Sequence, residues 1–330
     1  MKLKAGVIGI GSMGMHHVRI LSGLDQVELI SVADKNKSSL ENAEKKYKIR
    51  TYDDYKEMIN KENLDFICIS VPTNLHKEVA IACCEKKINV LVEKPIASNS
   101  EEAKEIIDAA KRNNVLLTVG HLERFNPAVL ELKKKLMNNE LGTVYKIEAD
   151  RLGPYPLGRI KDSGVVIDLA VHDLDIFRFL MDAGVTRIHA ETEKRIHSTN
   201  EDLLLALLKF DNNVLGVVDV NWLTPMKKRR LCIVGEKGMF EVDYINQSLR
   251  YYENSYVATG GDSPFSISEG RMIKYFIEKK EPLQSEIENF IDCIKNKKEP
   301  VVTGEDGLRA LMLAELIIKS ANNKEVLNLG

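Results

Sequence analysis

Near its start the chain reads Gly9-Ile10-Gly11-Ser12-Met13-Gly14, directly after the short apolar run Ala5 to Ile8. A stretch that we expect to be helical follows. The three glycines permit a tight turn, a close approach of the backbone to a ligand, and close packing of a helix on a strand. This order of strand, glycine turn and helix predicts a turn that holds a pyrophosphate at the helix N-terminus.

An acidic residue stands where such a turn requires one. Asp34 lies 20 residues beyond Gly14 and follows the second expected strand, Val27 to Ala33. A carboxylate there can accept hydrogen bonds from the ribose hydroxyls of an adenosine, which favours NAD over NADP. Lys35 and Lys37 leave NADP open, because a nearby cation can accept a 2′-phosphate.

The rest of the chain divides into two patterns. Up to about residue 120, short apolar runs alternate with charged, helix-forming stretches, which predicts an N-terminal Rossmann domain with a doubly wound parallel sheet. From about Val144 strands follow one another through short turns such as Glu236-Lys237-Gly238, which predicts a C-terminal α/β domain with a large, mostly antiparallel open sheet. One helix, about Val165 to Ala183, interrupts these strands. We therefore expect an α/β protein with domains at 1–122 and 123–330, and a last helix at about 308–320 that packs on the first domain.

Composition excludes several classes of protein. The 330 residues carry a formal net charge of -2, so bulk nucleic acid and anionic membranes find no basic surface. No apolar span reaches the roughly 20 residues of a membrane helix. The five cysteines form no CxxC pair and are odd in number, which argues against a disulfide framework or a zinc site. A cytoplasmic protein with a small-molecule ligand and no metal is expected.

Two further segments follow expected strands at the edge where open parallel sheets bind ligands. Pro72-Thr73-Asn74-Leu75-His76 comes after the run Phe66 to Val71, although a surface histidine explains His76 equally well. Glu93-Lys94-Pro95 comes after Val90 to Val92, and Pro95 fixes the local backbone, with a cis peptide bond open to it. Lys94 is thereby placed for chemistry rather than left as a surface lysine.

A third candidate group lies on the helix of the second domain. Asp168 and His172 are four residues apart and share one helical face. Their neighbours are apolar, and burying such a pair without partners would cost several kcal/mol. A structural role therefore needs strong hydrogen bonds, and a functional role needs a cleft. Asp and His can bind zinc, but three protein ligands cannot be assembled here.

In combination these motifs resemble the Gfo/Idh/MocA family of nicotinamide-dependent oxidoreductases over essentially the whole chain. The resemblance rests on the glycine turn, on the segments around Asn74 and Lys94, on Arg124-Phe125-Asn126-Pro127, and on Asp168 to Asp173. It implies a Rossmann domain and an α/β domain whose open sheet supports homodimers or homotetramers. It also implies that Lys94, Asp168 and His172 form the catalytic centre.

The chemistry of alcohol oxidation agrees with these roles. Loss of hydride to a nicotinamide requires a base for the hydroxyl proton and a group that stabilises the developing alkoxide. His172 is the favoured base and Lys94 the hydrogen-bond donor to the reacting oxygen. Lys94 is also the rival base, because a positively charged nicotinamide would lower the pKa of its amine. Asp168 is expected to orient Lys94, His172 or a sugar hydroxyl.

The substrate is inferred from a narrower resemblance. The stretch from Arg151 to Asp168 looks like that of family members that oxidise the C3 hydroxyl of UDP-N-acetylglucosamine to a 3-keto sugar. Arg151, Arg159 and Lys161 could bind the diphosphate, although a solvated loop explains them nearly as well. The four cations Lys227-Lys228-Arg229-Arg230 are interpreted first as protection of a sheet edge and second as a phosphate clamp.

The predicted site comprises three overlapping sets. The catalytic residues are Lys94, His172 and Asp168. The cofactor-binding residues are Gly9, Gly11, Ser12, Met13, Gly14, Asp34, Pro72, Thr73, Asn74, His76, Glu93 and Lys94. The substrate-binding residues are Lys94, Arg124, Asn126, Arg151, Arg159, Asp168 and His172.

Other functions remain open at this level. One is a myo-inositol or free-sugar dehydrogenase. Another is a regulator that binds the dinucleotide without turnover, which the presence of Lys94 and His172 argues against. A third is a glycoside hydrolase that uses bound NAD transiently and releases no net NADH.

Overall fold

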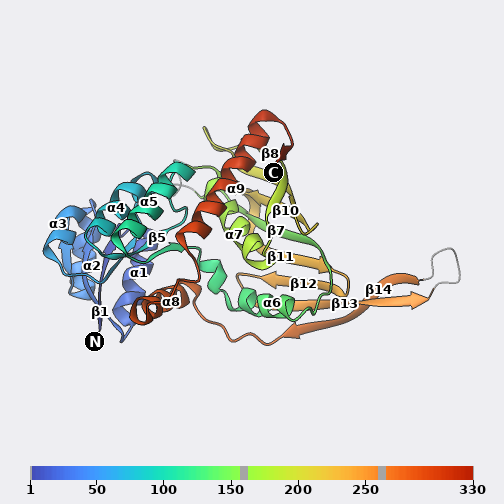
Figure 1. The fold of residues 1–330 in the computed structure, drawn as a ribbon, viewed down its shortest axis with the longest axis horizontal. Helices are drawn as coiled ribbons and strands as arrows, with labels where there is room; N and C mark the ends of the chain where they lie inside the picture. The colour runs from blue at the N-terminus through green and yellow to red at the C-terminus, as the bar shows by residue number, and fades with distance from the viewer. Residues whose placement is uncertain (1, 157–162, 259–264, 330) are drawn as a thin grey trace. The chain divides into compact units, whose positions relative to one another are not determined.

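The structure, a computed structural model, describes residues 2–156, 163–258 and 265–329. The chain forms two compact units (Figure 1). The first unit comprises Met1–Leu122 and Leu283–Met312, and the second comprises Glu123–Pro282 and Leu313–Gly330. The chain therefore leaves the first unit, builds most of the second, returns to the first, and ends in the second.

A six-stranded parallel sheet forms the centre of the first unit, in the order β3-β2-β1-β4-β5-β6. This is the strand order of the doubly wound dinucleotide-binding fold, as the alternating pattern predicts. Its strands are β1 (Leu3–Ile8), β2 (Val27–Ala33), β3 (Arg50–Tyr52), β4 (Phe66–Ile69), β5 (Asn89–Glu93) and β6 (Leu117–Gly120). The central strands β1, β4 and β5 are buried almost throughout, which is typical of a parallel sheet covered on both faces.

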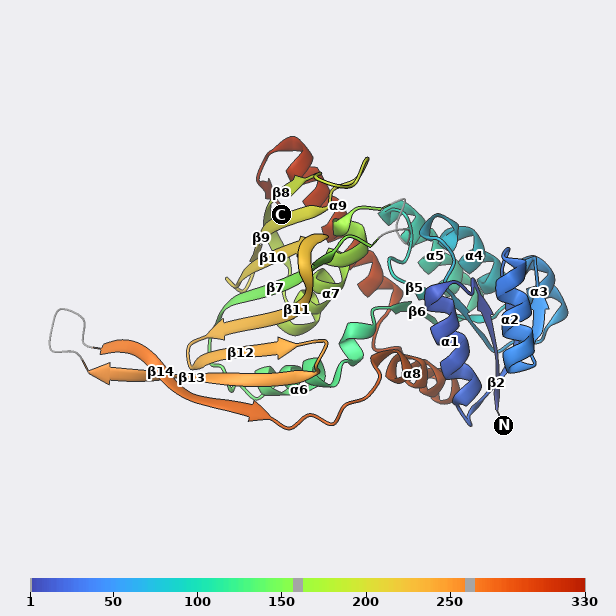
Figure 2. The ribbon, with the colours of Figure 1, turned by 180° about the vertical axis from the view of Figure 1, so that it is seen from behind.

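Helices cover both faces of this sheet (Figures 1 and 2). They are α1 (Ser12–Gly23), α2 (Lys37–Tyr47), α3 (Tyr55–Lys61), α4 (His76–Glu85), α5 (Ser100–Asn113) and α8 (Pro282–Asn296). The late helix α8 belongs here because Leu283, Ile287, Phe290 and Ile291 share one face and join the core of β1, α1 and α2. The Phe290 ring meets Phe66 edge to face, with centroids 5.8 Å apart.

A nine-stranded sheet forms the second unit, in the order β14-β13-β12-β11-β7-β10-β9-β8-β15. Among the described strands β7 and β10 pair in parallel and the other pairs are antiparallel, so the predicted mostly antiparallel sheet is confirmed. The strands are β7 (Val144–Pro154), β8 (Val185–Glu193), β9 (Leu203–Phe210), β10 (Leu215–Asn221), β11 (Leu223–Gly235), β12 (Gly238–Asp243), β13 (Ser248–Ala258), β14 (Phe265–Tyr275) and β15 (Leu327–Asn328).

One face of this sheet carries the core of the unit. The helices α6 (Pro127–Met137) and α7 (Val171–Met181) and the second part of α9 (Gly304–Asn323) lie on that face (Figures 1 and 2). Along β9, Leu204, Ala206 and Leu208 are buried, whereas Leu205 and Leu207 are 50% and 56% exposed. This alternation leaves the other face without a helical cover in the part of the chain that the structure describes.

Candidate functional site

The glycine turn has the geometry that a pyrophosphate requires. Gly9 has a φ of 82°, and a side chain there would meet the backbone of Ser70 at 2.7 Å. A Cβ on Gly14 would lie 1.9 Å from the Gly9 carbonyl oxygen, so α1 can approach the turn only without a side chain. Gly11 is different, because no atom of the described residues lies within 4 Å of its Cβ position. The space beside Gly11 is therefore open to a ligand.

The N-terminus of α1 is available to an anion. The helix begins at exposed Ser12 and half-buried Met13, and its cap residue, Gly11, supplies no side-chain hydrogen bond. The first backbone N–H groups of a helix have no partner within the helix and carry the positive end of its dipole. The turn therefore fits a dinucleotide phosphate.

Asp34 is held against this turn. Its Oδ2 accepts a hydrogen bond of 2.7 Å from the backbone N–H of Ile10, and its Oδ1 accepts one of 2.7 Å from Asn36. A carboxylate has lone pairs beyond those two bonds, and Asp34 is half-buried, so it can also accept from ribose hydroxyls. Lys35 and Lys37 are exposed beside it.

The segment after β4 contains both open and closed positions. Pro72 and Asn74 are exposed and Thr73 is half-buried, in a single 3-10 turn. His76 is 1% exposed. Its Nδ1 lies 2.9 Å from the carbonyl oxygen of Pro95, and its Nε2 lies 3.0 Å from that of Val71.

These contacts correct the prediction that His76 binds the cofactor. Burial lowers the pKa of the ring and favours the neutral form, which donates one hydrogen bond. Because both ring nitrogens face backbone carbonyl oxygens, neither is open to a dinucleotide. His76 instead links the loop after β4 to the loop after β5.

Glu93 and Lys94 are neighbours at the end of β5 but have different surroundings. Glu93 is 7% exposed, and its Oε1 lies 2.8 Å from Nε2 of the fully buried His17. Its Oε2 accepts a hydrogen bond of 3.3 Å from the backbone N–H of Lys94. Glu93 therefore supports the loop through both carboxylate oxygens, and its contact with the cofactor stays a prediction. Lys94 is half-buried at the end of β5, and its peptide bond to Pro95 is cis.

The segment with Asp168 and His172 begins differently from the predicted α-helix. Residues Val166–Ala170 form a π-helical turn, and the α-helix proper, α7, begins at Val171. Such turns occur often at functional sites. Asp168 and His172 are both half-buried, one on each side of this junction.

Glu201 fixes the start of that turn. Its Oε1 accepts a hydrogen bond of 3.2 Å from the backbone N–H of Val166, and its carbonyl oxygen accepts one of 3.0 Å from Val165. A Cβ on Gly164 would lie 2.0 Å from the same Oε1, so glycine leaves the room that the carboxylate occupies. Sequence reasoning missed Glu201, because it lies in a loop more than 30 residues away.

Two predicted substrate ligands, Arg151 and Arg124, form buried ion pairs within the second unit. Arg151 donates to the two carboxylate oxygens of Asp173 at 2.7 and 3.0 Å and is 4% exposed. Arg124 forms a similar buried pair with Asp175, at 2.8 and 2.6 Å. These pairs satisfy both guanidinium groups inside the second unit, so neither is left for a diphosphate.

Asn126 is likewise engaged. Its Oδ1 accepts from the backbone N–H of Ala128 and caps α6, and its Nδ2 donates to the carbonyl oxygen of Tyr244 at 3.1 Å. The structural signal was present in the sequence, because an Asn before Pro127 is typical of a helix start. Arg159 and Lys161, also predicted as ligands, lie outside the described residues.

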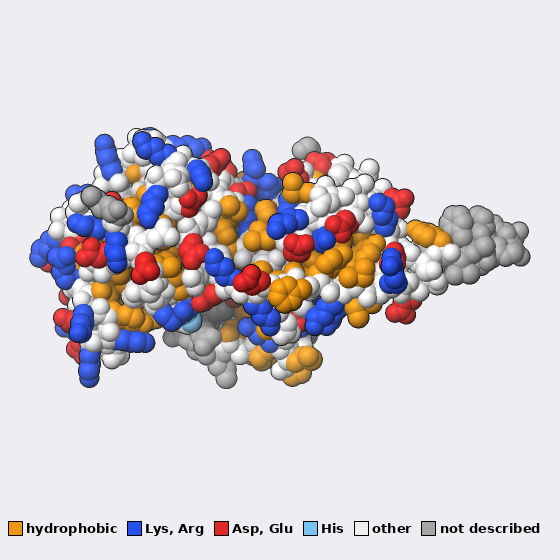
Figure 3. Space-filling view, turned by 90° about the horizontal axis from the view of Figure 1, so that it is seen from below, with side chains coloured by type: hydrophobic (Ala, Val, Ile, Leu, Met, Phe, Trp, Pro, Cys, Tyr) orange, Lys and Arg blue, Asp and Glu red, His pale blue; other side chains and the backbone are white. Residues whose placement is uncertain are grey.

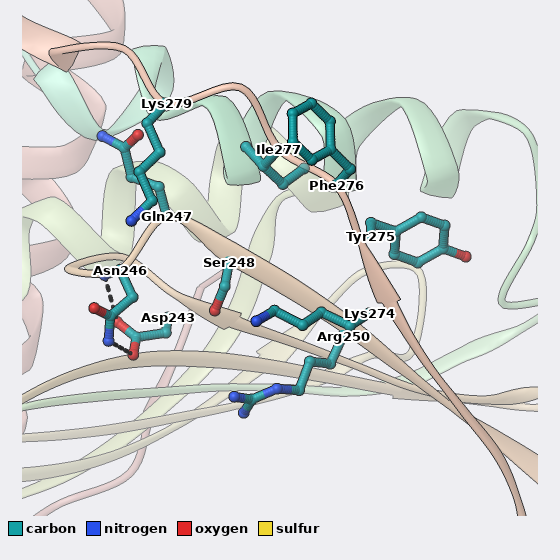
Figure 4. Close-up of a pocket in the computed structure, with 10 residues that line it drawn as sticks. All are labelled: Asp243, Asn246, Gln247, Ser248, Arg250, Lys274, Tyr275, Phe276, Ile277 and Lys279. Atoms are coloured by element: carbon teal, nitrogen blue, oxygen red, sulfur yellow. Dashed lines mark hydrogen bonds between the residues drawn. The ribbon is translucent and has the colours of Figure 1, made fainter.

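A separate pocket of about 550 Å³ lies beside β13 and β14 (Figure 4). No predicted site residue lines it. In Figure 4, the side-chain Nδ2 of Asn246 donates a hydrogen bond to the carboxylate of Asp243. The lining residues are Asp243, Asn246, Gln247, Ser248, Arg250, Lys274, Tyr275, Phe276, Ile277 and Lys279.

The described residues include neither a metal-binding cluster nor a membrane-spanning helix. No set of three or more His, Cys, Asp or Glu side chains is gathered so that it could hold a metal ion. No described helix has the length and apolar character needed to cross a membrane.

The family is shown by matches to both parts of the chain. Residues 3–121 match the oxidoreductase family with an NAD-binding Rossmann fold, and residues 133–329 match the C-terminal α/β domain of the same family. The chain therefore belongs to the Gfo/Idh/MocA oxidoreductase family and is an NAD-dependent oxidoreductase.

Several relatives resemble the chain over nearly its full length. It is 28% identical to a myo-inositol 2-dehydrogenase from Thermotoga maritima, over 99% of this chain and 98% of the relative. It is 26% identical to a UDP-N-acetylglucosamine 3-dehydrogenase from Acidithiobacillus ferrooxidans, over 94% and 95%.

Solved structures show the same fold. The crystal structure of the Acidithiobacillus enzyme covers 98% of each chain, with a TM-score of 0.85 and 24% identity. The WlbA dehydrogenase from Bordetella pertussis, solved with NADH and UDP-GlcNAcA, covers 100% of this chain and 99% of its own, with a TM-score of 0.83 and 23% identity.

Proposed function

We propose that the protein oxidises the C3 hydroxyl of a UDP-N-acetylhexosamine, such as UDP-N-acetylglucosamine, to the 3-keto sugar. The observation that carries this proposal is the half-buried pair Asp168 and His172 at a π-helical turn, within a chain that resembles a UDP-N-acetylglucosamine 3-dehydrogenase almost end to end. NAD supplies the hydride acceptor when it is bound.

The chain's own residues then have distinct tasks. The glycine turn and Asp34 hold the dinucleotide by its phosphates and its ribose. His172 takes the proton of the C3 hydroxyl, and Lys94 donates a hydrogen bond to the oxygen as negative charge develops on it. Asp168 orients the groups around that oxygen.

A second candidate is a myo-inositol or free-sugar dehydrogenase. The observation that favours it is the identity of 28% to the myo-inositol 2-dehydrogenase, slightly above the 26% to the nucleotide-sugar enzyme. Both candidates use the same base and hydrogen-bond donor, so they differ only in what the second unit recognises around the hydroxyl.

One panel separates these candidates. Purified protein is incubated with NAD or NADP and with UDP-N-acetylglucosamine, UDP-N-acetylgalactosamine, myo-inositol or glucose, and NADH formation is followed by absorbance. We expect NADH with a UDP-sugar and NAD. NADH from myo-inositol or glucose alone would overturn the nucleotide-sugar assignment, and binding without any NADH would favour the regulator. Hydrolysed product without NADH would indicate a glycosidase.

We also propose that the protein forms homodimers or homotetramers through the open face of its nine-stranded sheet. Leu205, Leu207 and Leu215 are about half exposed on neighbouring strands of that face, and together they make an apolar patch. Apolar patches of this kind mark contact surfaces. Hydrophobic side chains also gather on the surface of this unit toward β13 and β14 (Figure 3).

A further inference from the structure

Four consecutive cations on β11 are divided between the two faces of the sheet. Lys228 and Arg230 both pair with the carboxylate of Asp150 at 2.7 Å, and Arg230 also pairs with Glu148 at 3.0 Å. Successive side chains of a strand point to opposite faces. Arg229 therefore points to the other face, opposite Arg151 in the strand register.

The guanidinium of Arg229 is fixed in direction but has no carboxylate of its own. Its Nη1 donates to the carbonyl oxygens of Leu152 at 2.6 Å and Lys228 at 2.8 Å. Within the described part of the chain no ion pair joins Arg229 to an acidic residue. The nearby carboxylates of Asp173 and Glu123 form ion pairs with Arg151 instead. A half-buried cation is thus held in place without a direct counterion.

The backbone around Arg229 leaves room beside its charged end. Gly153 lies on the neighbouring strand, and among the described residues a Cβ there would meet the Nη1 and Nη2 atoms of Arg229 alone, at 3.9 Å. The register between β7 and β11 shifts between Leu223 and Lys228, immediately before this arginine. Such irregularities re-aim side chains and are common next to active sites.

Charged groups of both signs surround the guanidinium of Arg229. Burial and the neighbouring Arg151 lower the pKa of Arg229 to about 10. The carboxylates of Asp173, Glu123 and Asp168 act in the opposite sense and raise this pKa. Arginine binds phosphate and carboxylate groups through two parallel hydrogen bonds.

We propose that Arg229 binds an anionic group of the substrate, and that this group is a phosphate of the nucleotide sugar. This inference rests on the proposed function. The remaining guanidinium N–H groups would donate to phosphate oxygens, while Nη1 keeps its two carbonyl partners. A sugar carboxylate offers the same chemistry and is the alternative source of the anion.

The test compares Arg229→Gln and Arg229→Lys with the control Arg271→Gln. Arg271 is an exposed arginine of β14 whose pair with Glu253 lies at the surface. Binding of UDP-N-acetylglucosamine, glucuronate and myo-inositol to the NAD-loaded protein is measured by calorimetry, and thermal unfolding shows whether each variant is folded. We expect Arg229→Gln to weaken UDP-sugar binding about 10-fold to 100-fold, the usual range for a charged hydrogen-bond pair. Arg229→Lys should weaken UDP-sugar binding less, and Arg271→Gln should leave it unchanged.

The outcomes distinguish the two proposals. Equal UDP-sugar binding by wild type and a folded Arg229→Gln variant, or no UDP-sugar or glucuronate binding by wild type, would overturn the role of Arg229. Binding of glucuronate alone, lost in Arg229→Gln, would assign the carboxylate instead of the phosphate. Binding of the UDP-sugar that depends on Arg229 but yields no NADH would support the subsite and reject the dehydrogenase activity.

Discussion

At the residue scale, the predicted chemistry depends on two side chains. Lys94→Ala removes the proposed donor to the reacting oxygen, and His172→Ala removes the proposed base. We expect each to lower kcat by about 10²-fold to 10⁴-fold, the usual contribution of general acid–base catalysis, with NAD affinity nearly unchanged. Steady-state kinetics and a direct NAD titration check this.

The pH profile of the same variants identifies the base. If His172 is the base, the acidic limb of the kcat profile is lost in His172→Ala and kept in Lys94→Ala. Loss of that limb in Lys94→Ala alone would assign the base to the lysine. His16→Ala, a change at an exposed histidine in α1, is the control and should leave the profile as in the wild type.

A second prediction concerns the buried pair His17 and Glu93. Burial disfavours the imidazolium, but Cys68 and Glu93 outweigh it and raise the pKa of His17 well above 6.5. Because the pKa of His17 is higher in the folded than in the unfolded protein, its protonation stabilises the folded state fully at a pH below the unfolded-state pKa. This stabilisation is lost as the pH rises through the folded-state pKa. His17→Leu also leaves a buried carboxylate without its partner, which costs about 3 to 5 kcal/mol.

Urea unfolding at pH 6 to 9 measures this effect. The difference in unfolding free energy between wild type and His17→Leu should be largest near pH 6 and should shrink as the pH rises. The exposed neighbour provides the control, because His16→Leu should change the free energy of unfolding little. A difference that grows with pH would contradict the charged state of His17.

At the element scale, the local patterns predict most of the first unit because its signals are short in range. The glycine turn, its flanking strand and helix, and Asp34 lie within a single βαβ segment, and the structure holds them together through the hydrogen bond from Ile10 to Asp34. His17 and Glu93 are 76 residues apart, so no local pattern could join them. The same limit hid the pairs that occupy Arg124 and Arg151.

Side-chain alternation along β11 predicts more about this stretch than its charge alone does. Residues 227–230 look like one cationic block in the sequence, yet a strand must divide them between two faces. The division separates Arg229 from the ion pairs of Lys228 and Arg230. Arg229 is opposite Arg151 because of the pairing of β11 with β7, which only the fold supplies.

The glycine turn yields a matched pair of variants. In Gly14→Ala the new Cβ would lie 1.9 Å from a backbone oxygen, and we expect a loss of about 1 to 3 kcal/mol in unfolding free energy. In Gly11→Ala the Cβ meets nothing within 4 Å, so stability should be kept. The methyl group would instead stand where the pyrophosphate approaches, and NAD affinity should fall at least about tenfold, or ~1.4 kcal/mol.

Chemical denaturation and NAD titration of both variants test this division. Tight NAD binding by Gly11→Ala would show that the open space above the turn is not the phosphate site. Unchanged stability of Gly14→Ala would show that α1 can shift away from the turn at little cost.

At the scale of the whole molecule, the open sheet face suggests how copies of the chain assemble. Leu207 is 56% exposed on β9, and Val217 and Leu205 lie next to it on the same face. A charge in the middle of such a patch would have to be buried without a partner if two faces met. Leu207→Glu should therefore reduce the oligomer to monomers, as measured by sedimentation velocity at micromolar concentration.

Met137 provides the control for a change from an apolar to a charged side chain. It is 75% exposed at the end of α6, on the opposite side of the sheet from Leu207. Met137→Glu should keep the wild-type sedimentation coefficient. If Leu207→Glu is folded by thermal denaturation and sediments like the wild type, the open face is not the contact surface. If both variants are monomeric, the contact extends over the helical side of the unit as well.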